Sequence, residues 1–235
     1  MSVLTLDSDN DTWSVTLFGL TGDAPLKELR NPGTFDRVVS ACPAQAHWLG
    51  GTPITGVLAM AGGIDRLRRF VLDGRPVVTG FAAVGDAWAC TNPSAGRGLS
   101  IGIVHAQVLR RLVREHLDDP AKFAAEWNVR TDRDVAPFVH NQLAADTARI
   151  AEMDAIRNGR PLPPADSPMA RLVIAAGTDP DAFRALLETV LCTALPREVL
   201  ARPGMLERID RACADAPPRP APGPDRRRLL ELLAA

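Results

Sequence analysis

The sequence has little of what marks several large classes of protein. Its 235 residues carry 27 Lys and Arg against 28 Asp and Glu, so no overall positive charge draws the chain to nucleic acid. No apolar run approaches the ~20 residues that a membrane-spanning helix needs. The first residues, MSVLTLDSDNDTW, lack the basic and apolar segments of a secretory signal. These absences predict a cytoplasmic protein that neither binds nucleic acid nor spans a membrane.

Cysteine is scarce and scattered along the chain. The four cysteines form no C-x-x-C pair and no close cluster with histidine. Structural zinc sites and small disulfide frameworks depend on such spacings. The sequence therefore predicts reduced thiols and no metal site. The cysteines are Cys42, Cys90, Cys192 and Cys213.

The chain does contain enough apolar sequence for a substantial core. Hydrophobic residues make up 46% and charged residues 23% of the chain, as in ordinary globular proteins. Residues 1–20 hold two β-type runs around an Asp/Asn/Ser turn cluster, which predicts a hairpin, and two short helices are expected after it. From Asp118 onward nearly every periodic stretch is helical. The pattern predicts an α+β fold with an all-helical C-terminal region.

The segment RPVVTGFAAVGD, residues 75–86, is almost continuously apolar. It lacks the polar alternation of a half-solvated strand, so it predicts a strand inside a sheet that is covered on both faces. The segment ends at Asp86, and an ionised carboxylate there is costly to bury without hydrogen-bond donors. Open sheets bind ligands at the carboxyl ends of such strands. We therefore expect Asp86 to accept hydrogen bonds from a hydroxylated ligand.

A loop poor in side chains follows and leads directly into an amphipathic helix. Gly85 has no side chain, so another group can come close to the backbone there. Pro93, Gly96 and Gly98 make the rest of the loop rigid and poor in side chains. The backbone N–H groups of the loop then lie at the positive end of the helix dipole. Such an arrangement favours an anion or an electron-rich carbonyl group.

Residues 85–102, GDAWACTNPSAGRGLSIG, resemble the second flavin-binding motif of FAD-dependent oxidoreductases of the para-hydroxybenzoate hydroxylase and geranylgeranyl reductase type. The resemblance implies that Asp86 binds the ribityl hydroxyls of FAD. It also implies that the Pro and Gly residues line the pyrimidine side of the isoalloxazine ring, with the amides near Leu99 and Ser100 facing it. Arg97 has two interpretations: its side chain contacts the cofactor or the substrate, or it is a charge on the loop that is exposed to solvent. The cofactor-binding residues implied are Gly85, Asp86, Pro93, Gly96, Arg97, Gly98, Leu99 and Ser100.

One part of that family's pattern is missing from the chain. Its members begin with a βαβ unit bearing G-x-G-x-x-G for the ADP half of FAD, whereas Gly96, Gly98 and Gly102 give G-x-G-x-x-x-G. The chain therefore resembles the C-terminal portion of a flavoprotein, with a partial FAD-binding, monooxygenase-like fold.

The resemblance divides the chain into three parts. Residues 1–74 are expected to form part of a substrate domain with a small sheet, and residues 75–117 a flavin-contacting strand, loop and helix. Residues 118–235 are expected to form a helical region with a Pro-rich linker at 216–224.

The function that the resemblance implies is that of an FAD-dependent oxidoreductase, monooxygenase-like, which acts on a small organic substrate. The cofactor is FAD, and a reductase of the geranylgeranyl type is the close alternative. The catalytic residues are unknown, because in this chemistry the cofactor performs the hard step. A hypothesis of another class is a truncated, non-catalytic remnant or binding subunit that needs a partner chain carrying the ADP-binding half.

Two further interpretations of candidate site residues stand beside the prediction of a flavin site. The run GLSIG matches G-x-S-x-G, the nucleophile elbow of α/β-hydrolases, with Ser100 as nucleophile and His140 downstream. A long loop separates the predicted strand from Ser100, which argues against an elbow. His47, Trp48 and Met60 could line a substrate cavity, although ordinary core packing explains them better.

Overall fold

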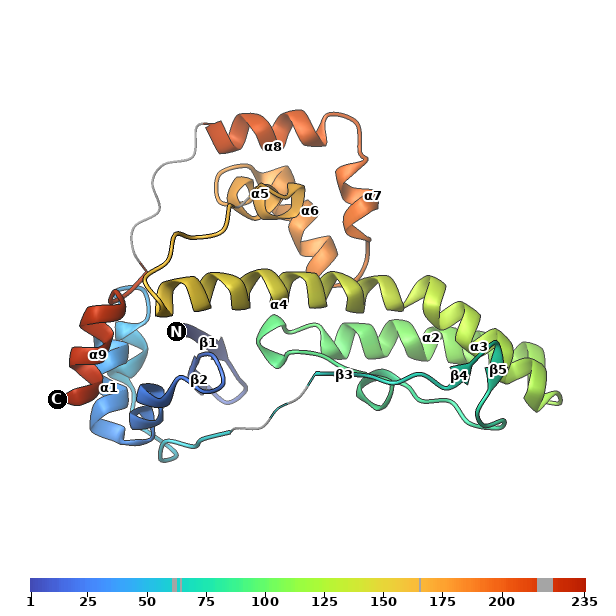
Figure 1. The fold of residues 1–235 in the computed structure, drawn as a ribbon, viewed down its shortest axis with the longest axis horizontal. Helices are drawn as coiled ribbons and strands as arrows, with labels where there is room; N and C mark the ends of the chain where they lie inside the picture. The colour runs from blue at the N-terminus through green and yellow to red at the C-terminus, as the bar shows by residue number, and fades with distance from the viewer. Residues whose placement is uncertain (61–62, 64, 165, 215–221) are drawn as a thin grey trace. The chain divides into compact units, whose positions relative to one another are not determined.

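The computed structural model describes residues 1–60, 63, 65–164, 166–214 and 222–235 (Figure 1). The chain divides into two compact units. We call Met1–Gly62, Ala148–Pro163 and Pro217–Ala235 the terminal unit. Gly63–Thr147 and Pro164–Ala216 form the central unit. Helices predominate and the sheets are small, which agrees with the α+β class in general terms.

The terminal unit begins with the predicted hairpin. Strands β1 (Ser2–Asp7) and β2 (Trp13–Phe18) pair antiparallel along their whole length. In the turn between them Asn10 and Asp11 have φ of 54° and 53°. Asn and Asp tolerate this left-handed region better than most residues, which explains why the turn cluster is a reliable signal.

The two short helices expected after the hairpin are also present. They are the 3-10 helix η1 (Ala24–Arg30) and the α-helix α1 (Pro32–Ser40), and the short η2 (Ala46–Gly50) follows. Asn31 begins α1 by accepting hydrogen bonds from two backbone N–H groups of its first turn. This is a local signal that the sequence carries openly.

The C-terminal helix α9 (Arg226–Ala234) packs against α1. Arg226 forms two hydrogen bonds of 2.8 Å to the carboxylate of Asp23, and a planar guanidinium matches a carboxylate in this way. The contact closes a small core. Its buried side chains are Val38, Leu229, Leu232 and Leu233. Of the Pro-rich linker predicted at 216–224, residues 216–221 lie outside the described residues.

The central unit begins with short strands: β3 (Arg66–Leu67) pairs with β6 (Ala89–Cys90), and β4 (Val71–Leu72) pairs with β5 (Arg75–Pro76). The prediction of a long buried strand over residues 75–86 is wrong. No strand is formed from Val77 to Val84, and Val77 is 62% and Phe81 46% exposed. A strand buried on both faces needs neighbours along its edges, and the described part of the chain offers none to this segment.

The predicted amphipathic helix is α2 (Gly98–His116), and it packs against α3 (Pro120–Asp134). The next helix, α4 (Ala136–Arg157), contributes residues 136–147 to the central unit and 148–157 to the terminal unit. Aromatic and branched side chains from α2, α3 and the start of α4 form one core with Trp88. Its larger members are Trp88, Ile101, Leu112, Phe123, Trp127, Val135, Phe138 and Val139.

Four further helices complete the central unit and surround a second core. Small alanines bring them close together, and Leu172, Val199 and Ile209 fill the space between them. The helical character expected from Asp118 onward is thus confirmed for the described residues. The helices are α5 (Pro168–Ala175), α6 (Pro180–Val190), α7 (Pro196–Leu200) and α8 (Met205–Ala214).

Asp179 holds two of these helices together. One carboxylate oxygen accepts hydrogen bonds of 2.9 Å from the N–H groups of Asp181 and Ala182, and the other lies 2.9 Å from Arg208 of α8. These bonds hold the pKa of the carboxyl below its usual value, the bond from Ala182 contributing most.

We expect Asp179→Ala to lower the free energy of unfolding by about 1 kcal/mol, because an N-cap is lost. Asp181→Ala is the matched control, since it removes only exposed ion pairs to Arg184 and Arg208. Urea denaturation followed by circular dichroism measures both variants. Equal losses in the two variants would contradict the capping role of Asp179.

Candidate functional site

The predicted cofactor loop joins β6 to α2. It contains the 3-10 helix η4 (Pro93–Ala95), and the Asn92 side chain caps this helix by accepting a 3.0 Å hydrogen bond from the Ser94 N–H. Gly96 has φ of 67°, a left-handed conformation that turns the chain toward α2 without a side-chain penalty. Arg97 is the N-cap residue of α2. The loop is therefore short, ordered by its own sequence, and bare at its turn.

Asp86 lies in the short 3-10 helix η3 (Gly85–Ala87), and its side chain lies beside the start of α2. A Cβ atom on Gly98 would stand 3.5 Å from the Asp86 Oδ1 atom, so the carboxylate sits against the first residue of α2. Asp86 is exposed, and only its backbone carbonyl is engaged, by Arg68 at 3.1 Å. Within the described residues the carboxylate itself has no hydrogen bond and no ion pair. It is free to accept hydrogen bonds from a ligand.

The first turn of α2 presents donors beside that carboxylate. The N–H groups of Gly98, Leu99 and Ser100 precede the first intrahelical bond, which runs from the Ile101 N–H to the Arg97 carbonyl. Arg97 supplies no side-chain cap to them. Leu99 is 78% exposed, so the turn is open to solvent. The positive end of the helix dipole and free N–H groups suit an anion or a polarised carbonyl.

His105 holds the backbone just before Asp86. Its Nδ1 accepts a 3.3 Å hydrogen bond from the Gly85 N–H, and its Nε2 lies 3.0 Å from the Thr131 hydroxyl. Because a backbone N–H can only donate, the ring proton is on Nε2. The ring is stacked on Trp127, with centroids 4.4 Å apart, and is completely buried. Burial lowers the pKa of His105 to about 4, so the imidazole is neutral.

This tether was missed by the sequence analysis. Gly85 and His105 are twenty residues apart in the chain, and nothing in the sequence indicates the hydrogen bond between them. A polar residue on the buried face of an amphipathic helix is the one signal that the sequence offers. His105 is thus a positioning residue for the Gly85–Asp86 step.

Arg97 is not the solvated loop charge that one interpretation assumed. Its side chain is buried, with the residue 8% exposed, and the Nε and Nη1 atoms have no hydrogen-bond partner in the described part of the chain. Burial lowers the pKa of the guanidinium, while Cys192 and Asp146 act to raise it. A contact between Arg97 and a cofactor stays a prediction.

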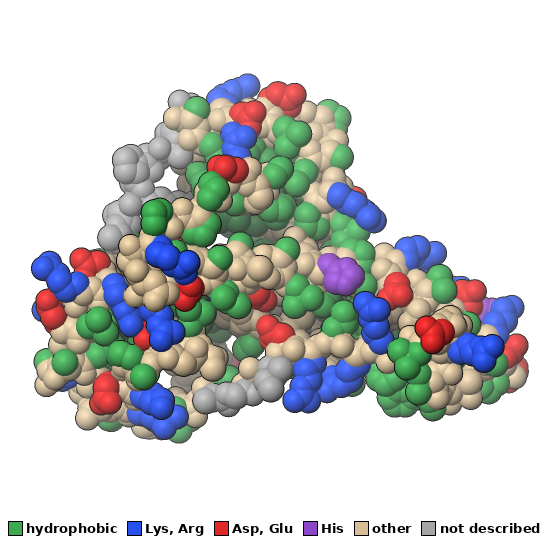
Figure 2. Space-filling view, in the orientation of Figure 1, with side chains coloured by type: hydrophobic (Ala, Val, Ile, Leu, Met, Phe, Trp, Pro, Cys, Tyr) green, Lys and Arg blue, Asp and Glu red, His purple; other side chains and the backbone are tan. Residues whose placement is uncertain are grey.

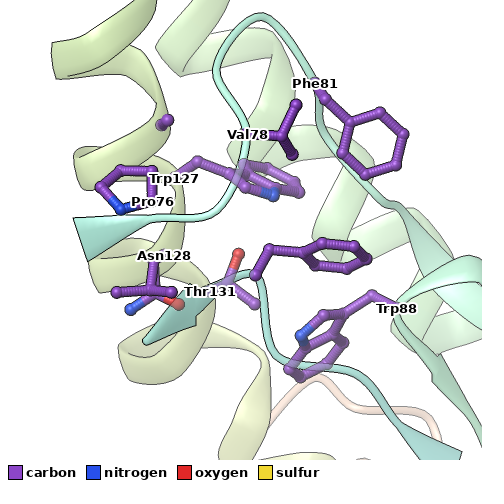
Figure 3. A pocket seen from close by; sticks show the side chains of 10 residues that line it. Pro76, Val78, Phe81, Trp88, Trp127, Asn128 and Thr131 are labelled. Carbon is purple, nitrogen blue, oxygen red and sulfur yellow. The ribbon is translucent and has the colours of Figure 1, made fainter. Parts of the chain in front are cut away.

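A small pocket lies between α3 and the segment that follows β5 (Figure 3). Val78 and Phe81 line it from that segment, and Trp127, Asn128 and Thr131 line it from α3. Its volume is about 20 Å³, enough for one water molecule and too small for an organic substrate.

The other candidate residues are not gathered into a site. Met60 is 87% exposed, and Trp48 is engaged by Trp13, whose indole N–H donates a 2.7 Å hydrogen bond to the Trp48 carbonyl. Ser100 lies in the third position of α2, and within the described residues no hydrogen bond joins it to His140. The hydrolase interpretation therefore gains no catalytic pair. Both signs of charge are interspersed on the face shown in Figure 2.

A scan against protein-family models, a search of curated proteins and a search of solved structures each gave no match. Among the described residues no helix is both long and apolar enough to cross a membrane. In the same part of the chain no three His, Cys, Asp or Glu side chains are grouped as metal ligands. The candidate site thus rests on its own geometry.

Proposed function

We propose that the chain binds the ribityl and isoalloxazine part of FAD and is an FAD-dependent, monooxygenase-like oxidoreductase or the C-terminal half of one. The observation that carries the proposal is the free Asp86 carboxylate beside the open first turn of α2. An acceptor for hydroxyl groups and a set of free N–H donors lie side by side there. These are the two kinds of group that a polyhydroxyl chain ending in a carbonyl-rich ring requires.

The residues of the site fit that ligand in complementary ways. Asp86 accepts hydrogen bonds from the ribityl hydroxyls, and the amides of Leu99 and Ser100 donate to the pyrimidine edge of the ring. Gly96 and Gly98 carry no side chain that would keep the ring away from the loop, and Pro93 makes the loop rigid. When bound, FAD supplies the electron-transfer or oxygenation chemistry, and the protein orients the ring and excludes water.

Binding of flavin tests the proposal directly. We expect Asp86→Ala to weaken the binding of FAD at least tenfold, because hydrogen bonds to a charged group contribute about 1.5–3 kcal/mol. Titration followed by the visible difference spectrum of the flavin measures the dissociation constant. Asp118→Ala is the matched control, since it removes an exposed carboxylate just beyond the opposite end of α2.

FMN serves as a second probe, because it contains the isoalloxazine ring and the ribityl chain with one phosphate but lacks the AMP part of FAD. Since the chain has no recognisable motif for ADP, we expect FMN and FAD to bind with similar affinities. Equal binding of FAD to the wild type and Asp86→Ala would refute the assigned role of Asp86.

A second candidate is a non-catalytic remnant or binding subunit that needs a partner chain carrying the dinucleotide-binding half. The observation that favours it is the apolar segment 77–84, which has the composition of a buried strand and forms none. A wild-type protein that shows neither a flavin difference spectrum nor thermal stabilisation by FAD supports this candidate.

A further inference from the structure

Two buried polar groups behind the cofactor loop have no hydrogen-bond partner among the described residues. They are the Nε and Nη1 atoms of Arg97 and the Oδ2 atom of Asp146 on α4, all within the central unit. Buried polar atoms without partners are rare in proteins and cost folding free energy. A buried cation and a buried carboxylate oxygen that both lack partners beside one loop therefore call for an explanation.

Asp146 ties the start of the loop to α4. Its Oδ1 atom accepts hydrogen bonds of 2.9 Å from Asn92 Nδ2 and from Gln142 Nε2. Asn92 is the residue that caps η4, so Asp146 fixes the point at which the loop begins. Arg97 stands at the other end of the same loop. The loop is thus flanked by a cation at its end and a carboxylate behind its start.

The two charges do not neutralise each other by contact. No nitrogen of Arg97 lies within 4.0 Å of a carboxylate oxygen among the described residues, yet Asp146 is near enough to act on the guanidinium electrostatically. A guanidinium keeps its proton even when it is buried. The buried cation therefore belongs to the N-cap residue of α2, and its charge has the same sign as the positive end of the helix dipole.

We propose that Arg97 and Asp146 form a charge couple that sets the redox preference of the flavin bound at this loop: Arg97 favours the reduced cofactor, and Asp146 opposes it. The inference rests on the proposed function, because it concerns the same site. Arg97 is then a positioning and charge-setting residue that acts from within the core, distinct from the exposed donors of the first turn.

The sign follows from the charge balance of reduction. Two electrons from an added chemical reductant and one proton from solvent convert FAD to its reduced form, which gains one negative charge on the pyrimidine edge. A nearby cation stabilises that form and a nearby carboxylate destabilises it. A unit charge within about 10 Å shifts such a preference on the order of tenfold at an effective dielectric constant of about 20.

The test compares the affinities of the full-length protein for reduced and oxidised FAD. The reduction potential of bound FAD, measured at saturation against a reference dye, reports their ratio. We expect Arg97→Met to lower the ratio about tenfold, which is about 30 mV for a two-electron couple, and Asp146→Asn to raise it by a similar factor. Arg114→Met is the control, since it removes an exposed charge about 24 Å along the same helix.

Opposite signs for the two variants support the charge couple, because a merely structural role would weaken binding in both and give no sign reversal. The charge couple is overturned if the reduction potential shifts in the same direction in both variants, or shifts no more than in Arg114→Met. It is also overturned if the variants fold but no longer bind FAD. Should Arg97→Met fail to fold, the nearly isosteric Asp146→Asn decides by the direction of its shift alone. A wild type that binds no flavin defeats the proposed function and this inference with it, whereas normal binding without opposite shifts defeats the inference only.

Discussion

The protein is expected to lose about 2 kcal/mol of folding free energy between pH 7.5 and pH 5 through His105 alone. Burial lowers the pKa of His105 to about 4, against 6.5 for an unperturbed histidine. Between these two pKa values the His105 side chain is protonated in the unfolded chain and stays neutral in the folded chain. Stability from the neutral ring is therefore fully present above pH 6.5 and is lost progressively as the pH falls toward 4.

The contribution of His105 can be separated from that of the carboxylates by comparing variants. His105→Gln keeps an acceptor and a donor without a titrating ring, so its free energy of unfolding should fall about 2 kcal/mol less over the same pH interval. His140→Gln is the control, because His140 is exposed. Urea denaturation at the two pH values gives each difference. An identical pH dependence in the wild type and His105→Gln would show that the ring is not held neutral.

The sequence is a good guide where a structure is determined by neighbouring residues. The hairpin depends on turn residues such as Asn10 and Asp11, and the helices begin where Asn31 and Asp179 cap them. Each of these signals acts over a few residues of backbone. Local hydrogen bonding therefore made the hairpin and the helix starts predictable.

The sequence fails where a structure needs a distant partner. Residues 77–84 have the composition of a central strand, but a strand is completed by its neighbours, and the described residues supply none. Composition reports which environment a segment prefers and does not report whether the rest of the chain provides it. This mismatch between preference and environment is also what favours a missing partner for this chain.

The candidate site likewise has one part that the sequence predicts and one part that it does not. The loop from Asn92 to Gly98 and its closeness to Asp86 follow from residues adjacent in sequence, and the geometry agrees with that expectation. His105 and Asp146 contact the site from α2 and α4, at separations of 20 and 54 residues, and no motif marks them. Residues that position a site from behind are set by tertiary packing, which a single sequence does not reveal.

Gly85→Val is expected to lower the free energy of unfolding by about 2 kcal/mol, since Gly85 has φ of 56° and a β-branched residue is strained there. The substitution also displaces the N–H that His105 accepts from, so the binding of flavin should weaken with stability. Gly102→Ala is the matched control on the facing helix. Its Cβ would lie 3.9 Å from the Gly85 Cα atom, an ordinary contact, and alanine favours a helix by up to about 1 kcal/mol over glycine.

The two glycines touch each other, so the comparison separates backbone conformation from close packing. If packing between Gly85 and Gly102 were decisive, both variants would be destabilised alike. If the left-handed conformation is decisive, Gly85→Val loses stability, Gly102→Ala does not, and Gly85→Asn falls between them because asparagine tolerates positive φ. Thermal and urea unfolding of the three variants distinguishes the cases, and an unaffected Gly85→Val would show that the Gly85–Asp86 step does not require the conformation on which the site depends.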